Sequence, residues 1–86
     1  MDIYEFIWDI NIVEKIILKH GVLPEEVEQV FQGKPIIRSH RGVYVALGRT
    51  IAGRFLFVVF KQAGKAALKI ITARDMTVNE KRLYQR

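Results

Sequence analysis

Residues 54–61 read R-F-L-F-V-V-F-K, an apolar run bounded by two cations. Its aromatic and β-branched residues favour a strand, and its length is typical of one that is buried. Alternate residues of a strand point to opposite faces of its sheet. Both sets are apolar here: Leu56, Val58 and Phe60 on one side, Phe55, Phe57 and Val59 on the other. We therefore expect a central strand with two faces to cover.

The residues on both sides of this run predict a β-meander. Turns are expected at residues 41–42, 50–53 and 62–65, where glycines and polar residues cluster. They separate strands expected at residues 36–38, 43–49, 54–61 and 66–74. Connections this short join antiparallel neighbours.

Two helices are expected before the meander, after a first strand over residues 4–8. Asp9 suits the N-cap of the first helix, and Gly21 suits the residue after its end. The second helix begins near Pro24 and ends by Gly33. Leu23 is a poor N-cap, so we expect this start either to fray or to be held by packing of Leu23.

The chain closes with a further helix. Thr77-Val78-Asn79-Glu80 matches a capping box, which predicts a helix from Val78 to the C-terminus. The fold class is then α+β, as one domain over residues 1–86, with two N-terminal helices packed on an antiparallel sheet of four to five strands and a short C-terminal helix. Two helices cover only one side of such a sheet. The other side must face the C-terminal helix, a partner or a second copy in a homodimer.

Charge is distributed unevenly along the 86 residues. Residues 1–33 hold seven acids and two bases, a balance of −5, whereas residues 34–86 hold twelve bases and two acids, a balance of +10. A basic face attracts phosphate backbones, although surface cations also serve solubility alone. Absence of cysteine excludes disulfides and thiolate chemistry. Acids near the N-terminus (Asp2, Glu5, Asp9) and short apolar runs predict a cytoplasmic protein that does not act at a membrane.

No catalytic motif stands out, and two distant histidines make a poor metal site, so no metal or cofactor is expected. What remains is a set of cations, most of them near strand ends: Arg49, Arg54, Lys61, Lys65, Lys69 and Arg74. Each alone is more often a solvated surface charge, and only their number favours a polyanion ligand such as RNA.

Metal-free RNA cleavage needs a base near the 2′-hydroxyl, an acid near the leaving 5′-oxygen and fixed positive charge around the phosphate. Arg74 suits the third role through its bidentate fork. His20 or Tyr84 suits the proton roles if the fold brings it near Arg74. The structural alternatives are a helix C-terminal cap for His20 and packing on the sheet for Tyr84.

Five ordered segments of the chain resemble BrnT-type toxins of bacterial toxin–antitoxin systems. They are F-I-W-D, K-H-G-V, P-E-E-V-E-Q-V-F, A-L-G-R-T-I-A-G-R-F-L-F-V-V-F and I-T-A-R-D-M-T-V-N-E-K-R-L-Y. The resemblance implies a RelE-like fold and a metal-independent endoribonuclease that inhibits translation. It also implies neutralisation by a cognate antitoxin, typically a ribbon–helix–helix DNA-binding dimer. The alternative is a non-catalytic RNA- or protein-binding module, such as a degenerate toxin.

The resemblance carries over to particular residues of the site. Lys19 and His20 match the second segment, Arg54 the fourth, and Arg74, Lys81, Arg82 and Tyr84 the last. The sequence therefore predicts catalytic residues His20, Arg74 and Tyr84, and RNA-binding residues Lys19, Arg49, Arg54, Lys69 and Arg82. Ile10, Ile12 and Leu23 depart from the family pattern, which implies a modified interface and removes no candidate residue.

Overall fold

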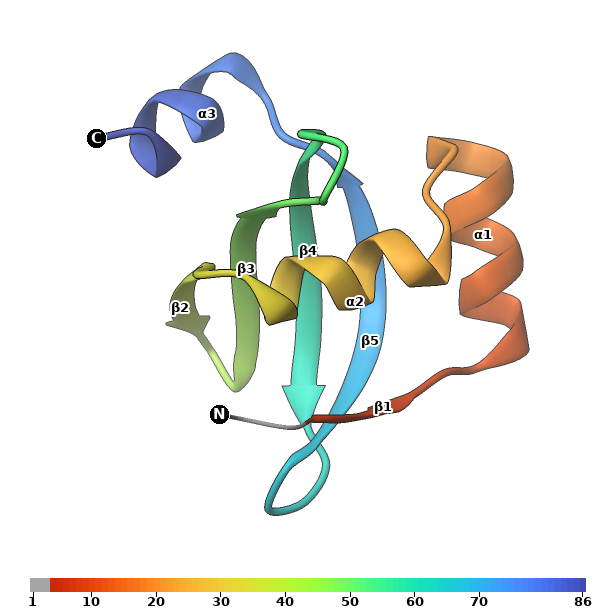
Figure 1. Cartoon of the computed structure of the whole chain (residues 1–86). Coiled ribbons are helices and arrows are strands. Elements are labelled where there is room, and N and C mark those ends of the chain that lie inside the picture. Colours follow the sequence, from red (N-terminus) through yellow and green to blue (C-terminus); the bar gives the residue numbers. More distant parts are fainter. Residues whose placement is uncertain (1–3) are drawn as a thin grey trace.

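A computed structural model describes residues 4–86, and its elements follow the expected order. They are β1 (Glu5–Ile7), α1 (Ile10–His20), α2 (Pro24–Gln32), β2 (Ile36–His40), β3 (Val43–Arg49), β4 (Phe55–Gln62), β5 (Ala67–Asp75) and α3 (Val78–Tyr84). The predicted α+β class, with two helices before the meander and one after it, is confirmed (Figure 1). β2 runs two residues further than expected, up to the turn at Arg41-Gly42.

The sheet has five strands in the order β1-β5-β4-β3-β2. β2, β3, β4 and β5 are antiparallel neighbours, as the short turns require. β1 differs from the expected antiparallel arrangement because it pairs with β5 in parallel. Both helices and three strands separate β1 from β5 in the chain, so no tight hairpin imposes an antiparallel direction on this pair.

α1 and α2 pack on one face of the sheet, and α2 crosses in front of the central strands (Figure 1). Fully buried side chains fill the space between them, among them Ile16, Val27, Val30, Leu56 and Ile70. The approach of α2 to β3 requires Gly48. A Cβ at Gly48 would lie 2.6 Å from Cγ1 of Val30, closer than real side chains come. The helices thus cover the central strands of one face of the sheet.

The ends of α1 are capped as the sequence predicts. Oδ1 of Asp9 accepts a hydrogen bond of 2.7 Å from the backbone N–H of Asn11. Gly21 follows the helix in the left-handed conformation, with φ of 63°. The start of α2 follows neither expectation, because Leu23 stays exposed and the helix is held by Glu26. A carboxylate oxygen of Glu26 accepts a hydrogen bond of 3.0 Å from the backbone N–H of Leu23.

α3 lies beyond one end of the second face of the sheet, near the start of β4, and leaves most of that face open (Figure 1). None of the helices in the described part of the chain is long and apolar enough to cross a membrane.

Candidate nucleic-acid interface

The face of the sheet turned away from α1 and α2 is cationic. Strand register places Arg38, Val45, Val59 and Thr72 in one row across it, and Ile36, Leu47, Phe57 and Arg74 in the next. A third row ends in Lys61 directly opposite Lys69. Like charges in that position repel each other. We call this surface the open face. Strands β2, β3, β4 and β5 contribute no acidic side chain to it.

Arg74 lies where β5 approaches α3, with its guanidinium 3.8 Å from the ring centre of Phe57. This distance is well within the range of cation–π attraction. Nη1 and Nη2 donate to the two carboxylate oxygens of Glu80 at 2.8 and 3.0 Å, and Nη1 also donates to the carbonyl of Asp75. Among residues 4–86, Nε of Arg74 has no hydrogen-bond partner. The side chain is therefore fixed in position but keeps donors for a ligand.

Glu80 connects Arg74 to the start of α3. Its carboxylate accepts from the backbone N–H of Thr77 at 2.8 Å, and the hydroxyl of Thr77 accepts from the backbone N–H of Glu80 at 3.2 Å. This is the predicted capping box. The hydrogen bond from Arg74 is the main reason why the pKa of Glu80 lies below its ordinary value. One carboxylate thus sets both the orientation of α3 and the position of the guanidinium.

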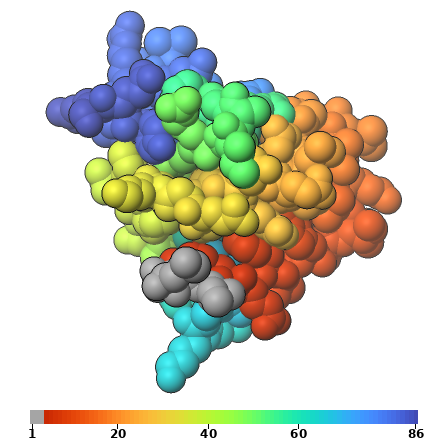
Figure 2. Space-filling view, viewed as in Figure 1, coloured from red at the N-terminus to blue at the C-terminus, as the bar shows by residue number. Residues whose placement is uncertain are grey.

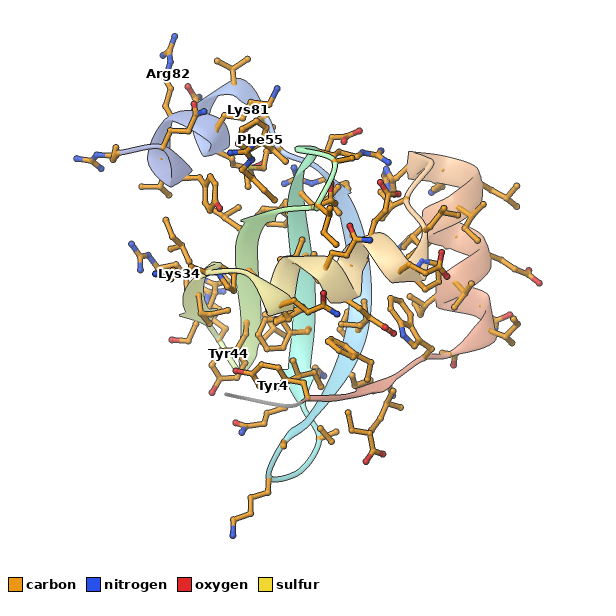
Figure 3. All side chains as sticks on the ribbon, in the orientation of Figure 1. Tyr4, Lys34, Tyr44, Phe55, Lys81 and Arg82 are labelled. Atoms are coloured by element: carbon orange, nitrogen blue, oxygen red, sulfur yellow. The ribbon has the colours of Figure 1, made fainter. Side chains whose placement is uncertain are left out.

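A second aromatic ring gathers the remaining groups of α3. The ring of Phe55 lies 5.1 Å from the guanidinium of Arg49 and 5.6 Å from Nζ of Lys81. The ring of Tyr84 meets it edge-on at 5.9 Å between ring centres. Figure 3 shows Lys81 against Phe55, whereas Arg82 points away from the sheet. Arg49, Lys81 and Tyr84 therefore surround Phe55 at the same end of the open face as Arg74.

Arg54 lies at the same end of the sheet but on the helix side. All five of its N–H donors are used: two on Asp75, one on Glu26, one on the carbonyl of Gly21 and one on the carbonyl of His20, at 2.7–3.1 Å. The hydrogen bond to Asp75 is the main cause that raises the pKa of Arg54, and it lowers that of Asp75. Arg54 joins the end of α1, the start of α2 and the end of β5.

The predicted site residues other than Arg82, which points away from the sheet, therefore fall into two groups. Arg49, Arg74 and Tyr84 meet at the α3 end of the open face, and Lys69 lies on the same face further along β5. Lys19, His20 and Arg54 lie on the helix side. Phe55, Phe57 and Glu80, which hold these groups in place, are not among the site residues predicted from the sequence. Alternation along β4 and the capping box were the available signals for them.

The fold and this face together describe a small α+β protein that presents a fixed arginine on a cationic sheet surface, a suitable arrangement for a polyanion. The family model for "Ribonuclease toxin, BrnT, of type II toxin-antitoxin system" matches residues 8–80. The chain belongs to this BrnT family, which confirms the resemblance seen in its sequence. Family membership implies a cognate antitoxin as partner.

A solved structure agrees with this assignment. The chain is similar to the crystal structure of the Brucella abortus ribonuclease toxin, BrnT, with a TM-score of 0.69 and 25% sequence identity over 87% of this chain and 99% of that one. A search of curated protein sequences finds no match.

Proposed function

We propose that this protein is a toxin endoribonuclease that cleaves RNA on the open face, without a metal ion, and thereby inhibits translation. One observation carries the proposal: the guanidinium of Arg74 is stacked on Phe57 and still has unused donors, on a face to which strands β2 to β5 contribute only cations as charged groups. Fixed donors of this kind stabilise the charge that builds on a phosphate during cleavage. Membership of a ribonuclease toxin family supports the same function.

The proposed reaction is an attack of the 2′-oxygen on the adjacent phosphorus. The 2′-hydroxyl loses its proton to a base, the bond from phosphorus to the 5′-oxygen breaks, and that oxygen takes up a proton. Tyr84 is the predicted proton-transfer residue at the Arg74 end of the open face, where its ring contacts Phe55, two residues before the Phe57 that carries Arg74. His20 lies on the helix side, where its carbonyl binds Arg54, so we assign it no proton transfer.

The cations around Arg74 suit binding along the RNA backbone. Arg49 and Lys81 flank Phe55 next to the proposed cleavage position, and Lys61 and Lys69 extend the positive surface to the far end of the strands. We propose these four residues as phosphate contacts. Arg54 is outside this set because its donors are already occupied.

Glu80 gives a reason to keep a second candidate function. Its carboxylate holds Arg74 and would repel a phosphate at the same place. A protein with this arrangement could also bind RNA without cutting it, as a degenerate toxin.

Expression of the protein without its antitoxin separates the two functions. The endoribonuclease proposal predicts growth arrest with fragmented cellular RNA, and Arg74→Ala should relieve both. Arg74→Lys is the matched control, since it keeps the charge and loses the bidentate fork. Compared with Arg74→Ala, it should recover more of the RNA binding than of the cleavage. Normal growth with intact RNA, at an expression level confirmed by blotting, would leave only the binding function.

A further inference from the structure

β2 is an edge strand of the sheet. Its only partner among the strands of residues 4–86 is β3. The turn between them has two residues, Arg41 and Gly42, with φ of 49° and 83°, as in a type I′ hairpin. In such a hairpin His40 and Val43 form the closing hydrogen-bonded pair, and bonded pairs alternate along the strands. Ile37 and Ser39 therefore direct their backbone N–H and C=O groups away from β3.

A cleft of about 600 Å³ opens beside this edge, on the helix side of the sheet. Ile37 of β2 forms part of its wall, and Phe31, Phe60 and Leu68 are among the lining residues that reach into the core. Figure 2 shows a hollow between the end of α2 and β1.

Aromatic rings form much of this cleft. The rings of Tyr44 and Phe60 are stacked at 5.5 Å, and Phe31 meets Phe60 edge-on at 5.1 Å. Tyr4 meets Phe31 edge-on from the opposite wall. Figure 3 places Tyr4 and Tyr44 close together. Clefts of this size and lining accept bulky apolar groups.

β2 and the segments that flank it in the chain carry positive charges only. The chain has no acidic residue between Glu28 and Asp75, and Lys34, Arg38 and Arg41 lie in or next to β2. Arg38 pairs with Val45 and thus points to the open face, opposite to Ile37. An anionic partner would be attracted to this edge, and its charges would be drawn to the Arg38 side of the strand.

We propose that the edge of β2 and the adjoining cleft bind an extended acidic segment of the cognate antitoxin, which adds a strand to the sheet outside β2. The outward amides and carbonyls of Ile37 and Ser39 supply the backbone hydrogen bonds, and the cleft supplies side-chain specificity. The observations favour a peptide over RNA here because the free groups of β2 are spaced for a strand and the adjoining cleft is apolar.

The register predicts the pattern of the bound segment. Residues directly opposite each other share a face of the sheet, so the partner residue beside Ile37 is bulky and apolar. The residues before and after it in the bound segment point to the open face, as Arg38 does, and we expect them to be acidic. Their carboxylates would extend the partner's negative charge over the open face, where it opposes RNA binding without touching Arg74. Only this expected effect on RNA binding rests on the proposed function; the added strand does not.

Amide hydrogen exchange tests the added strand directly. The probe is the complex purified after co-expression with the antitoxin, compared with the protein alone. The amides of Ile37 and Ser39 should exchange at least about tenfold more slowly in the complex, since each gains a hydrogen bond. The amides of Arg38 and His40 already bind β3 and serve as internal controls. Unchanged exchange at Ile37 and Ser39 in the saturated complex would overturn the proposal.

A pair of variants gives a second measurement. Ser39→Pro removes an outward N–H and leaves the β3 side intact, and Ser39→Ala keeps that N–H. The proline variant should bind the antitoxin about tenfold more weakly than the alanine variant by calorimetry. Equal affinities of the two folded variants would contradict an added strand.

RNA is the competing occupant of this edge. A short single-stranded RNA titrated into the isolated protein should leave the Ile37 and Ser39 amides unprotected, and protection by RNA would overturn the choice of a peptide. These readouts measure binding only. They therefore stand even if the protein cleaves no RNA, and a failure of the proposed endonuclease would be seen separately in the expression experiment.

Discussion

Arg54 and Arg74 lie at the same end of the sheet and both form ion pairs with carboxylates, yet their surroundings differ. All five N–H donors of Arg54 are used, on three segments of the chain that are distant in sequence. Arg74 uses three donors, all on residues within six positions, and rests on an aromatic ring of the open face. Both arginines carry the same charge, so the number of nearby hydrogen-bond acceptors makes the difference. An arginine whose donors are all used joins segments of the chain, whereas one with unused donors can bind a ligand.

The largest expected effect is on the stability of Arg54→Ala. This change leaves the carboxylates of Glu26 and Asp75 and the carbonyls of His20 and Gly21 without their donor. We expect a loss of about 2–4 kcal/mol in the free energy of unfolding, measured by urea denaturation. Arg54→Lys, which keeps the charge, should recover part of it. A loss below about 0.5 kcal/mol would show that the ion pairs of Arg54 are merely superficial.

Arg74→Ala should act on RNA affinity instead. If Arg74 contacts a phosphate as proposed, the variant loses that contact, and we expect at least about tenfold weaker binding at low salt. The slope of log affinity against log salt should fall by about 1. Stability should change by about 1 kcal/mol or less because the Arg74–Glu80 pair is local and partly exposed. Binding by filter assay at several salt concentrations measures both quantities. If Arg74→Ala unfolds while Arg54→Ala stays folded, Arg74 is the arginine that stabilises the fold and Arg54 is not.

Glu80→Gln tests how the carboxylate beside Arg74 affects RNA affinity. Glutamine still accepts from the backbone N–H of Thr77, so the cap of α3 is kept, but the negative charge beside Arg74 is removed. We expect RNA to bind about three- to fivefold more tightly, with a stability loss of about 1 kcal/mol. Glu26→Gln, beside Arg54, is the matched control and should leave RNA affinity unchanged. Weaker RNA binding by Glu80→Gln would show that Glu80 helps the ligand by positioning Arg74.

The smallest expected effect is on the pH dependence of stability. Hydrogen bonds from Arg74 and Arg54 are the main causes that lower the pKa values of Glu80 and Asp75 below 4.5 and 3.8. The unfolded chain then binds more protons than the folded one just below these ordinary values, so stability falls as pH falls through the folded pKa values.

Arg74→Ala removes the Glu80 part of this dependence. Its free energy of unfolding, measured by urea denaturation, should therefore decrease less than that of the parent protein between about pH 5 and pH 3, and the difference should be under about 1 kcal/mol. Arg54→Lys serves as the reference, since it leaves the Arg74–Glu80 pair unchanged. Identical acid dependence in Arg74→Ala and the parent protein would show that this pair is broken in solution.

The elements were predictable because their signals are local. The alternation of β4, the cap at Asp9 and the box at Thr77 each depend on residues a few positions apart. The parallel pairing of β1 had no such signal, since it joins residues about sixty positions apart in the chain. The start of α2 differs from both expectations because the side chain of Leu23 cannot cap a helix. Glu26, three residues later, accepts from the backbone N–H of Leu23 and also from the distant Arg54.

By itself, the sequence determined the order of helices and strands, the resemblance to BrnT toxins and the concentration of cations after residue 33. Hydrophobic period, capping residues and charge are properties of short segments, so they can be read without a fold. Only the tertiary structure decided which cations share a surface. Adjacent residues of a strand point to opposite faces, and the register of β4 against β5 therefore directs Arg74 toward Phe57 and Asp75 toward Arg54.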